Sequence, residues 1–186
     1  HRALVFEKNE YLVEHLVKLL EKLFKVSVAV RKYGKKHIID IPNAVRLWLL
    51  RNFPEGVGEY QPSRRVPALI ARSGRDAVAG FIAGLFDAEG HSDGSQDYIC
   101  ISSRDLAYGV RLLMLRLGIV AYLERKKCVK HCNYDAWCVY PPGAFARQLF
   151  RSAVKPVKSL APVPKKEVAD LIPITELIAK SLAELP

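Results

Sequence analysis

The chain repeats its own plan, and this duplication limits the fold more than any other feature of its 186 residues. Apolar and basic residues of the first third return later in the same order, first 94 positions on and then 100 positions on. Two such blocks in one order favour a duplicated structural unit over chance identity. At the offset of 94, the recurring residues are Leu12, Leu19, Leu23, Val26, Arg31 and Lys32, which return as Leu106, Leu113, Leu117, Val120, Arg125 and Lys126. At the offset of 100, they are Pro42, Ala44, Leu49 and Arg51, which return as Pro142, Ala144, Leu149 and Arg151.

Each copy predicts a short strand, an amphipathic helix, a hairpin and a closing helix. The strands are "ALVF" and "YICI", and Asn9 and Ser103 are suited to cap the helices that follow. Gly118 is suited to end the second of these helices, and Gly34 to form the turn of the first hairpin. Strands and helices in this order indicate an α+β protein.

A helix with unusual glycines precedes the second copy, within "GFIAGLFDAEGHSDG" at residues 80–94. Ser73 and Asp76 are spaced like a capping box, so we expect this helix to run from about residue 74 to residue 88. Each glycine weakens a helix by about 1 kcal/mol relative to alanine, so small residues on one face need a reason such as a closely packed partner. Without further context, the alternative is a core helix with an acidic, glycine-capped end. The small-residue face comprises Ala77, Gly80, Gly84 and Ala88.

The charge of the chain favours a polyanionic partner. There are 29 Lys and Arg against 19 Asp and Glu, a formal net charge of +10, and the isoelectric point is near 9.5. Such a surplus is typical of proteins that bind DNA or RNA, because neutralised phosphates release counterions. No apolar run approaches the roughly 20 residues that span a membrane. "HRALVFEKNEYL" is unlike a signal peptide, so we expect a cytoplasmic, organellar or nucleoid-associated protein that is not secreted. The chain also lacks an initiator Met, from which we expect the numbering to start inside a longer gene product.

Four cysteines do not form the pattern of a secreted disulfide framework. Three of them, Cys128, Cys132 and Cys138, lie in "CVKHCNYDAWC" at spacings that match no common zinc motif. The sequence favours buried thiols in a hairpin and leaves a metal clip or a single disulfide as alternatives.

The segment "IAGLFDAEG", residues 82–90, resembles the LAGLIDADG motif of homing endonucleases, and the elements that follow it come in that family's order. The resemblance covers about residues 1–153. It implies two pseudo-symmetric αββαββα repeats with saddle-shaped antiparallel sheets, the first of which lacks its motif helix. The expected divisions are a first repeat at 1–55, a linker at 56–73, a second repeat at 74–153 and a tail with an amphipathic helix at 154–186. The identical motif positions are Ala83, Gly84, Leu85, Asp87, Ala88 and Gly90.

The resemblance also assigns roles to individual residues. Glu89, with Gly90, would bind Mg²⁺ or another divalent cation beside a scissile phosphate, since hard cations prefer oxygen ligands. Lys8 and Arg104 follow the strands at the positions where the family places a basic catalytic residue. The remaining roles are a helix interface at Gly80, Ala83 and Gly84, and a cap or packing position at Asp87.

DNA contacts are expected from the two hairpins, because two-stranded ribbons fit the major groove. A merely solvated hairpin tip is the alternative. The expected contact residues are Arg31, Lys32, Lys35, Lys36 and His37 in the first copy, and Arg125, Lys126, Lys127 and Lys130 in the second, with Glu124 beside them.

The function implied is site-specific hydrolysis of double-stranded DNA by an intron- or intein-encoded enzyme. The alternatives are a nucleic-acid binder that does not cleave, such as an RNA maturase, and a basic structural domain. A single-chain member needs two motif helices, and only one lies within these residues. We therefore expect an upstream fragment to carry the first motif helix and its acidic residue.

Overall fold

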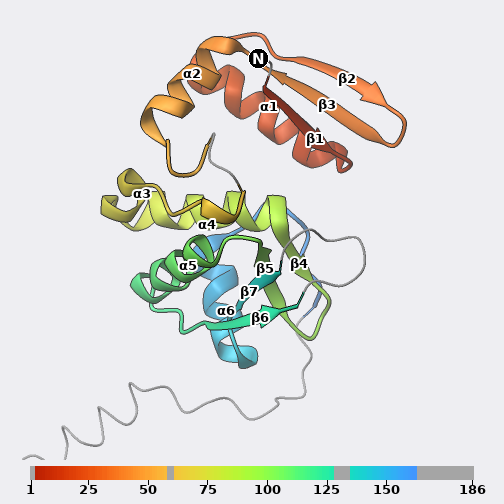
Figure 1. Cartoon of the computed structure of the whole chain (residues 1–186). Coiled ribbons are helices and arrows are strands. Elements are labelled where there is room, and N and C mark those ends of the chain that lie inside the picture. Colours follow the sequence, from red (N-terminus) through yellow and green to blue (C-terminus); the bar gives the residue numbers. More distant parts are fainter. Residues whose placement is uncertain (1–2, 58–60, 128–134, 163–186) are drawn as a thin grey trace, which may run out of the picture. The chain divides into compact units, whose positions relative to one another are not determined.

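The computed structural model describes residues 3–57, 61–127 and 135–162, and the chain divides into two compact units. The first unit comprises His1–Arg72 and the second Ser73–Pro186 (Figure 1). Within the described ranges, no helix has the length and apolar character needed to cross a membrane. The predicted tail helix and Lys130 lie outside the described residues.

The first unit is an antiparallel three-stranded sheet with helices packed on it. The strand order is β1-β3-β2, and the core consists of Val13, Leu20, Val28, Ile39 and Val45. In chain order the elements are β1 (Ala3–Glu7), α1 (Glu10–Phe24), β2 (Ala29–Tyr33), β3 (Lys36–Ile41), α2 (Asn43–Asn52), η1 (Gln61–Ser63) and α3 (Ala68–Arg72).

The second unit has the complete αββαββα order and a four-stranded antiparallel sheet, β4-β5-β7-β6. The predicted α+β class with antiparallel sheets is therefore confirmed. Val78, Ile82 and Phe86, spaced four residues apart, bury one side of α4 completely. The elements are α4 (Arg75–Glu89), β4 (Gly90–Ser92), β5 (Asp97–Ile101), α5 (Arg104–Arg116), β6 (Tyr122–Lys126), β7 (Ala136–Tyr140) and α6 (Gly143–Val154).

The residues predicted to cap helices or to form a turn do so in the structure, with one exception. Asn9 Oδ1 accepts hydrogen bonds from the backbone N–H groups of α1, and Ser103 Oγ accepts one from Leu106. Gly34 and Gly118 adopt positive φ, which glycine tolerates at no steric cost. The exception is the start of α4, where Gly74 is the N-cap and makes no side-chain hydrogen bond. The predicted N-cap at Ser73 is therefore displaced by one residue to Gly74. The Ser73 carbonyl accepts a hydrogen bond from the Arg116 guanidinium.

Strand register corrects the repeat alignment by one residue. The offset of 94 holds in β1 and β5, because Val5 pairs with Ile39 as Ile99 pairs with Val139. In β2 and β6 the offset of 94 fails. Ile38 and Cys138 are equivalent positions of β3 and β7, and the residues opposite them are Arg31 and Glu124, so Arg31 corresponds to Glu124 and not to Arg125. The offset after the long helices is thus 93, because α5 is two residues shorter than α1 and the connection from α5 to β6 is one residue longer than that from α1 to β2. Val26 therefore corresponds to the buried Ile119. A shift of one residue reverses which face of the sheet a side chain occupies.

A disulfide joins Cys100 on β5 to Cys138 on β7, which lie directly opposite each other with their Cα atoms 4.2 Å apart. The favoured interpretation of a free thiol is therefore wrong for Cys138, which takes part in a single disulfide, the alternative left open above. Cys128 and Cys132 lie outside the described residues.

Candidate nucleic-acid and metal site

The acidic end of α4 presents one carboxylate to solvent. Glu89 is exposed as the last residue of the helix, and Gly90 directly after it is buried. A Cβ atom at Gly90 would overlap the carbonyl oxygen and the ring of Phe86. Only glycine fits this turn from helix to strand, and the turn fixes the position of the Glu89 backbone at the end of α4.

The second carboxylate of the motif is used differently. Asp87 Oδ1 accepts a hydrogen bond from the backbone N–H of Lys158 at 2.7 Å, and Oδ2 accepts from Val157 N–H at 3.1 Å. Asp87 thus anchors the segment that follows α6, as suits a packing residue. Glu89 remains the carboxylate available at the end of the helix.

Metal donors beyond Glu89 are scarce in the second unit. Among the described residues, no group of three or more His, Cys, Asp or Glu side chains is placed to hold a metal ion. The carbonyl oxygen of Gly90 accepts a hydrogen bond from Lys158 Nζ at 2.7 Å. That ammonium competes with a cation for the same oxygen, so the assignment of Gly90 as a metal ligand stays a prediction. The donor chemistry at Glu89 suits a hard divalent cation that takes its other ligands from water, phosphate or a second carboxylate.

The two basic residues predicted to assist catalysis lie in different surroundings. Lys8 follows β1 in the first unit, where its backbone N–H donates to Glu7 Oε1. Arg104 begins α5 and places its guanidinium over the Trp137 ring, 5.6 Å from the ring centroid. Lys158 was missed by the sequence analysis, although its ammonium contacts the residue next to Glu89. No periodic pattern marks Lys158, which lies in a Pro- and Lys-rich stretch after the last helix.

The predicted small-residue face of α4 is open. Ala77, Gly80, Gly84 and Ala88 are all exposed, while Ala83 is half-buried at the margin of this face. Cβ atoms added at Gly80 and Gly84 would meet no heavy atom within 4 Å. These glycines therefore do not serve packing inside the second unit, and their role in a helix interface stays a prediction.

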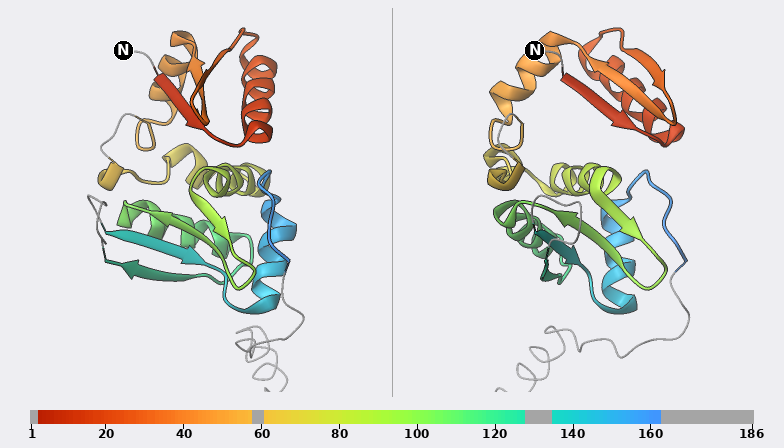
Figure 2. Two further views of the ribbon diagram at one scale, coloured as in Figure 1. Left: turned by 90° about the vertical axis from the view of Figure 1, so that its right-hand side faces the viewer. Right: turned by 45° about the vertical axis from the view of Figure 1, so that its right-hand side comes forward.

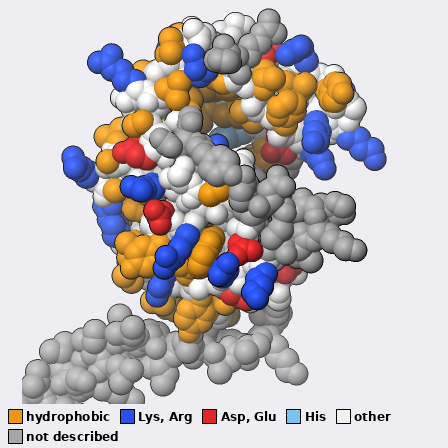
Figure 3. Space-filling model, viewed as in Figure 1, with side chains coloured by type: hydrophobic (Ala, Val, Ile, Leu, Met, Phe, Trp, Pro, Cys, Tyr) orange, Lys and Arg blue, Asp and Glu red, His pale blue; other side chains and the backbone are white. Residues whose placement is uncertain are grey.

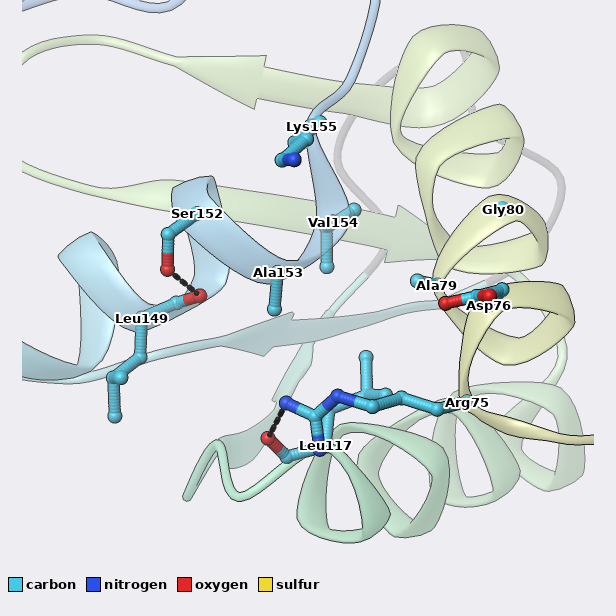
Figure 4. A pocket seen from close by; sticks show the side chains of 10 residues that line it. All are labelled: Arg75, Asp76, Ala79, Gly80, Leu117, Leu149, Ser152, Ala153, Val154 and Lys155. Carbon is cyan, nitrogen blue, oxygen red and sulfur yellow. Dashed lines mark hydrogen bonds between the residues drawn. The ribbon is translucent and has the colours of Figure 1, made fainter.

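A cavity of about 490 Å³ borders the N-terminal half of this face (Figure 4). Asp76, Ala79 and Gly80 line it from α4, and the last turn of α6 lines it from the other side. Arg75 spans part of the cavity and donates to the Leu117 carbonyl at 3.0 Å. The cavity thus reaches the small-residue face at Gly80.

The basic residues of the first hairpin divide between the two faces of its sheet. Side chains alternate along a strand, and Ile39 marks the face that the helices cover. Arg31 and Lys36 lie on the opposite, open face, and Arg31 forms a two-bonded ion pair with Asp40. Lys32 and His37 lie on the helix-covered side, and His37 Nε2 is 3.8 Å from Glu10 Oε1. Lys35 is in the turn after β2.

In the second hairpin, Lys126 is on the open face and Arg125 is not. Arg125 lies opposite Trp137 and forms an ion pair with Asp135. Lys126 Nζ lies 4.9 Å from the centroid of the Tyr98 ring. The His91 ring packs on the same Tyr98 ring, with the two ring centroids 5.3 Å apart. His91 and Tyr98 are open-face residues that the sequence analysis did not select, because their strands are short and carry no basic cluster. Lys127 directly follows β6. Figure 3 shows Lys and Arg side chains on the surfaces of both units.

Comparison with known proteins shows that part of the chain matches one protein family and that the chain is similar in fold to solved structures of one homing endonuclease. Residues 76–153 match the family described as a LAGLIDADG-like domain. The chain is similar to a mesophilic variant of the homing endonuclease I-DmoI, with 14% identity and a TM-score of 0.59 over 83% of this chain and 80% of that one. It is also similar to I-DmoI in complex with DNA and Mn, with 16% identity and a TM-score of 0.58 over 86% and 82%. An I-DmoI variant bound to its target DNA in the presence of Mg has 16% identity and a TM-score of 0.56 over 83% and 80%.

Two curated relatives match over a small part of their length. The glutamine–fructose-6-phosphate aminotransferase of Methanocaldococcus jannaschii is 29% identical over 125 residues, which are 65% of this chain. Elongation factor 2 of Methanopyrus kandleri is 27% identical over 146 residues, or 77% of this chain. In each case the match spans 11% of the relative's own length.

Proposed function

We propose that this chain, which belongs to the LAGLIDADG homing endonuclease family, binds double-stranded DNA and provides half of a divalent-metal site that hydrolyses it. The observation that carries this proposal is the exposed Glu89 carboxylate at the end of the motif helix, held in place by a turn that admits only glycine. Mg²⁺ or a related cation bound at Glu89 would stabilise negative charge on a phosphodiester. The DNA and metal complexes of I-DmoI support both partners for this chain.

The first unit gives a reason to propose a second motif helix. Leu19 and Leu23 of α1 are 42% and 63% exposed, whereas their counterparts, Leu113 in α5 and Leu117 at its C-cap, are 3% and 5% exposed. In the second unit α4 packs against α5 and β5, and the first unit contains no helix before β1 within its described residues. A helix like α4, supplied by an upstream fragment, would cover these leucines at a gain of about 25 cal/mol per Å² of buried apolar surface.

We further propose that this chain is the endonuclease part of an in-frame insert, as in an intein. An aminotransferase and an elongation factor have unrelated activities, yet both match this chain over about a tenth of their length. A segment shared by otherwise different proteins is what a mobile insertion leaves behind. An intron-encoded protein that stands alone would not explain these two relatives.

The test is cleavage by the protein that contains this chain, with its natural upstream sequence, of a target duplex selected from a randomised library. We expect cutting or nicking with Mg²⁺, and loss of cutting in Glu89→Gln while DNA affinity is retained. Asp76→Asn is the matched control, because it also neutralises an exposed carboxylate on α4, but at the other end of the helix. Unimpaired cutting by Glu89→Gln would exclude this site. Tight binding without any cutting by the parent protein would favour the alternative, a binder that does not cleave.

A further inference from the structure

The residues after α6 form a strap that returns to the acidic end of the motif helix. We define the strap as residues 155–162; Figure 2 shows it passing the end of α4 and running on beside β4. Its backbone N–H groups at Val157 and Lys158 bind the Asp87 carboxylate, and Ala161 N–H donates to Ser92 Oγ at 2.9 Å. The strap is thus held at two places, one on each side of Gly90.

Lys158 belongs to the first of these anchors through its backbone, and its side chain makes a separate contact. Its Nζ donates to the Gly90 carbonyl oxygen at 2.7 Å, and the side chain is half-buried. Consecutive Cα atoms are about 3.8 Å apart, so this ammonium lies within roughly 9 Å of the Glu89 Cα. A phosphate bound beside Glu89 is within reach of a lysine side chain at that distance.

Three arginines of the second unit are each engaged by another side chain. Arg104 stacks on Trp137, and Arg147 and Arg151 bind the buried Asp97. Lys158 is held only by a neutral carbonyl oxygen, so exchanging that contact for a phosphate oxygen costs one hydrogen bond and gains a charge-assisted one.

We propose that Lys158 is a catalytic residue, which contacts the scissile phosphate beside Glu89 and stabilises the charge that develops during hydrolysis. This inference rests on the proposed function. In the reaction, water forms a bond to phosphorus and the bond from phosphorus to the leaving sugar oxygen breaks. The water proton passes to solvent, and the leaving oxygen takes a proton from solvent. Lys158 keeps its proton throughout and acts by its charge.

The experiment compares Lys158→Met, Lys158→Arg and the control Lys155→Gln in the complete protein. Lys155 is an exposed cation three residues earlier, at the C-cap of α6. Single-turnover cleavage of the selected duplex with Mg²⁺ measures the chemical step, and a binding titration with Ca²⁺ measures affinity. We expect Lys158→Met to lower the cleavage rate on the order of 100-fold with less than about a threefold change in affinity. Lys158→Arg restores a large part of the rate, and Lys155→Gln cleaves like the parent.

Each other outcome separates the two proposals. If the parent protein does not cleave, the proposed function fails, whatever Lys158 does. If the parent cleaves and Lys158→Met cleaves equally fast, the catalytic role of Lys158 is excluded. If Lys158→Met and Lys158→Arg lose rate and thermal stability together, the lysine only holds the strap, and the inference is overturned.

Discussion

Arg151 binds Asp97 through two hydrogen bonds, from Nε at 2.7 Å and from Nη2 at 2.8 Å, and so ties α6 to β5 inside the second unit. Arg147 approaches the same carboxylate at 3.3–3.4 Å, and Ser92 Oγ donates to it at 2.6 Å. Asp97 is fully buried. In the first unit the counterpart of Arg151 is Arg51, but that of Asp97 is Ala3, so the two copies no longer share this anchor.

Asp97→Asn is expected to destabilise the second unit by about 3–5 kcal/mol, because it leaves two partly or fully buried guanidinium groups without a counter-charge. The free energy of unfolding in urea measures this loss. Asp135→Asn breaks the more exposed pair with Arg125 in the same unit and should cost about 1 kcal/mol or less. Equal losses in the two variants would show that Asp97 is not a structural anchor.

Acid should weaken the second unit through the same carboxylate. Burial alone would raise the pKa of Asp97, but the hydrogen bonds from Arg151, Ser92 and Arg147 outweigh it and hold the pKa below its usual range. A lowered pKa in the folded state contributes stability above the unfolded value, near 3.9, and loses it as the pH falls through the folded value. Unfolding measured from pH 7 to pH 2 should therefore show a drop below about pH 4 that is smaller in Asp97→Asn. A parallel decline in both proteins would contradict this assignment.

Gly90→Ala should destabilise the chain by about 1–3 kcal/mol, because the new methyl group overlaps Phe86. Gly84→Ala is the matched control in the same helix, where the methyl group meets open space and better helix propensity adds up to about 1 kcal/mol. Thermal unfolding of both variants tests the pair. If Gly84→Ala stabilises this chain but weakens its assembly with an upstream motif helix, the small-residue face is the interface proposed for it.

Reduction of the disulfide should lower stability by about 3–4 kcal/mol, since Cys100 and Cys138 close a loop with a sequence separation of 38. Unfolding with and without dithiothreitol measures the effect. The free energy of unfolding of Cys100→Ser, which cannot form this disulfide, should be the same with and without dithiothreitol. Peptide mapping of the oxidised protein should recover Cys100 linked to Cys138. A linkage of Cys138 to another cysteine would contradict the register of β5 and β7.

The motif helix and the elements within each copy were predictable because they follow from local spacing, and the duplication was visible because the same local pattern recurs along the chain. The fourfold spacing of apolar residues in α4 and the caps at Asn9 and Ser103 depend only on residues a few positions apart. The disulfide, the strap and the Asp97 anchor join residues 38 to 71 positions apart, and no local pattern encodes such pairings. The register of β6 was mispredicted for a related reason: a helix shorter by two residues and a connection longer by one together shift the strand by one residue without changing its composition.

That register decides which hairpin residue should contact DNA. Lys126 lies on the open face beside Tyr98, whereas Arg125 lies on the helix-covered face and pairs with Asp135. Lys126→Gln should therefore weaken DNA binding and reduce the slope of log affinity against log salt by about 0.9, the value for one phosphate contact. Arg125→Gln removes the same charge one residue away and should leave the slope unchanged. Binding titrations of both variants between 50 and 200 mM salt, roughly the range over which such slopes are resolved, distinguish the two positions. The reverse ranking would mean that the hairpin meets DNA with its other face.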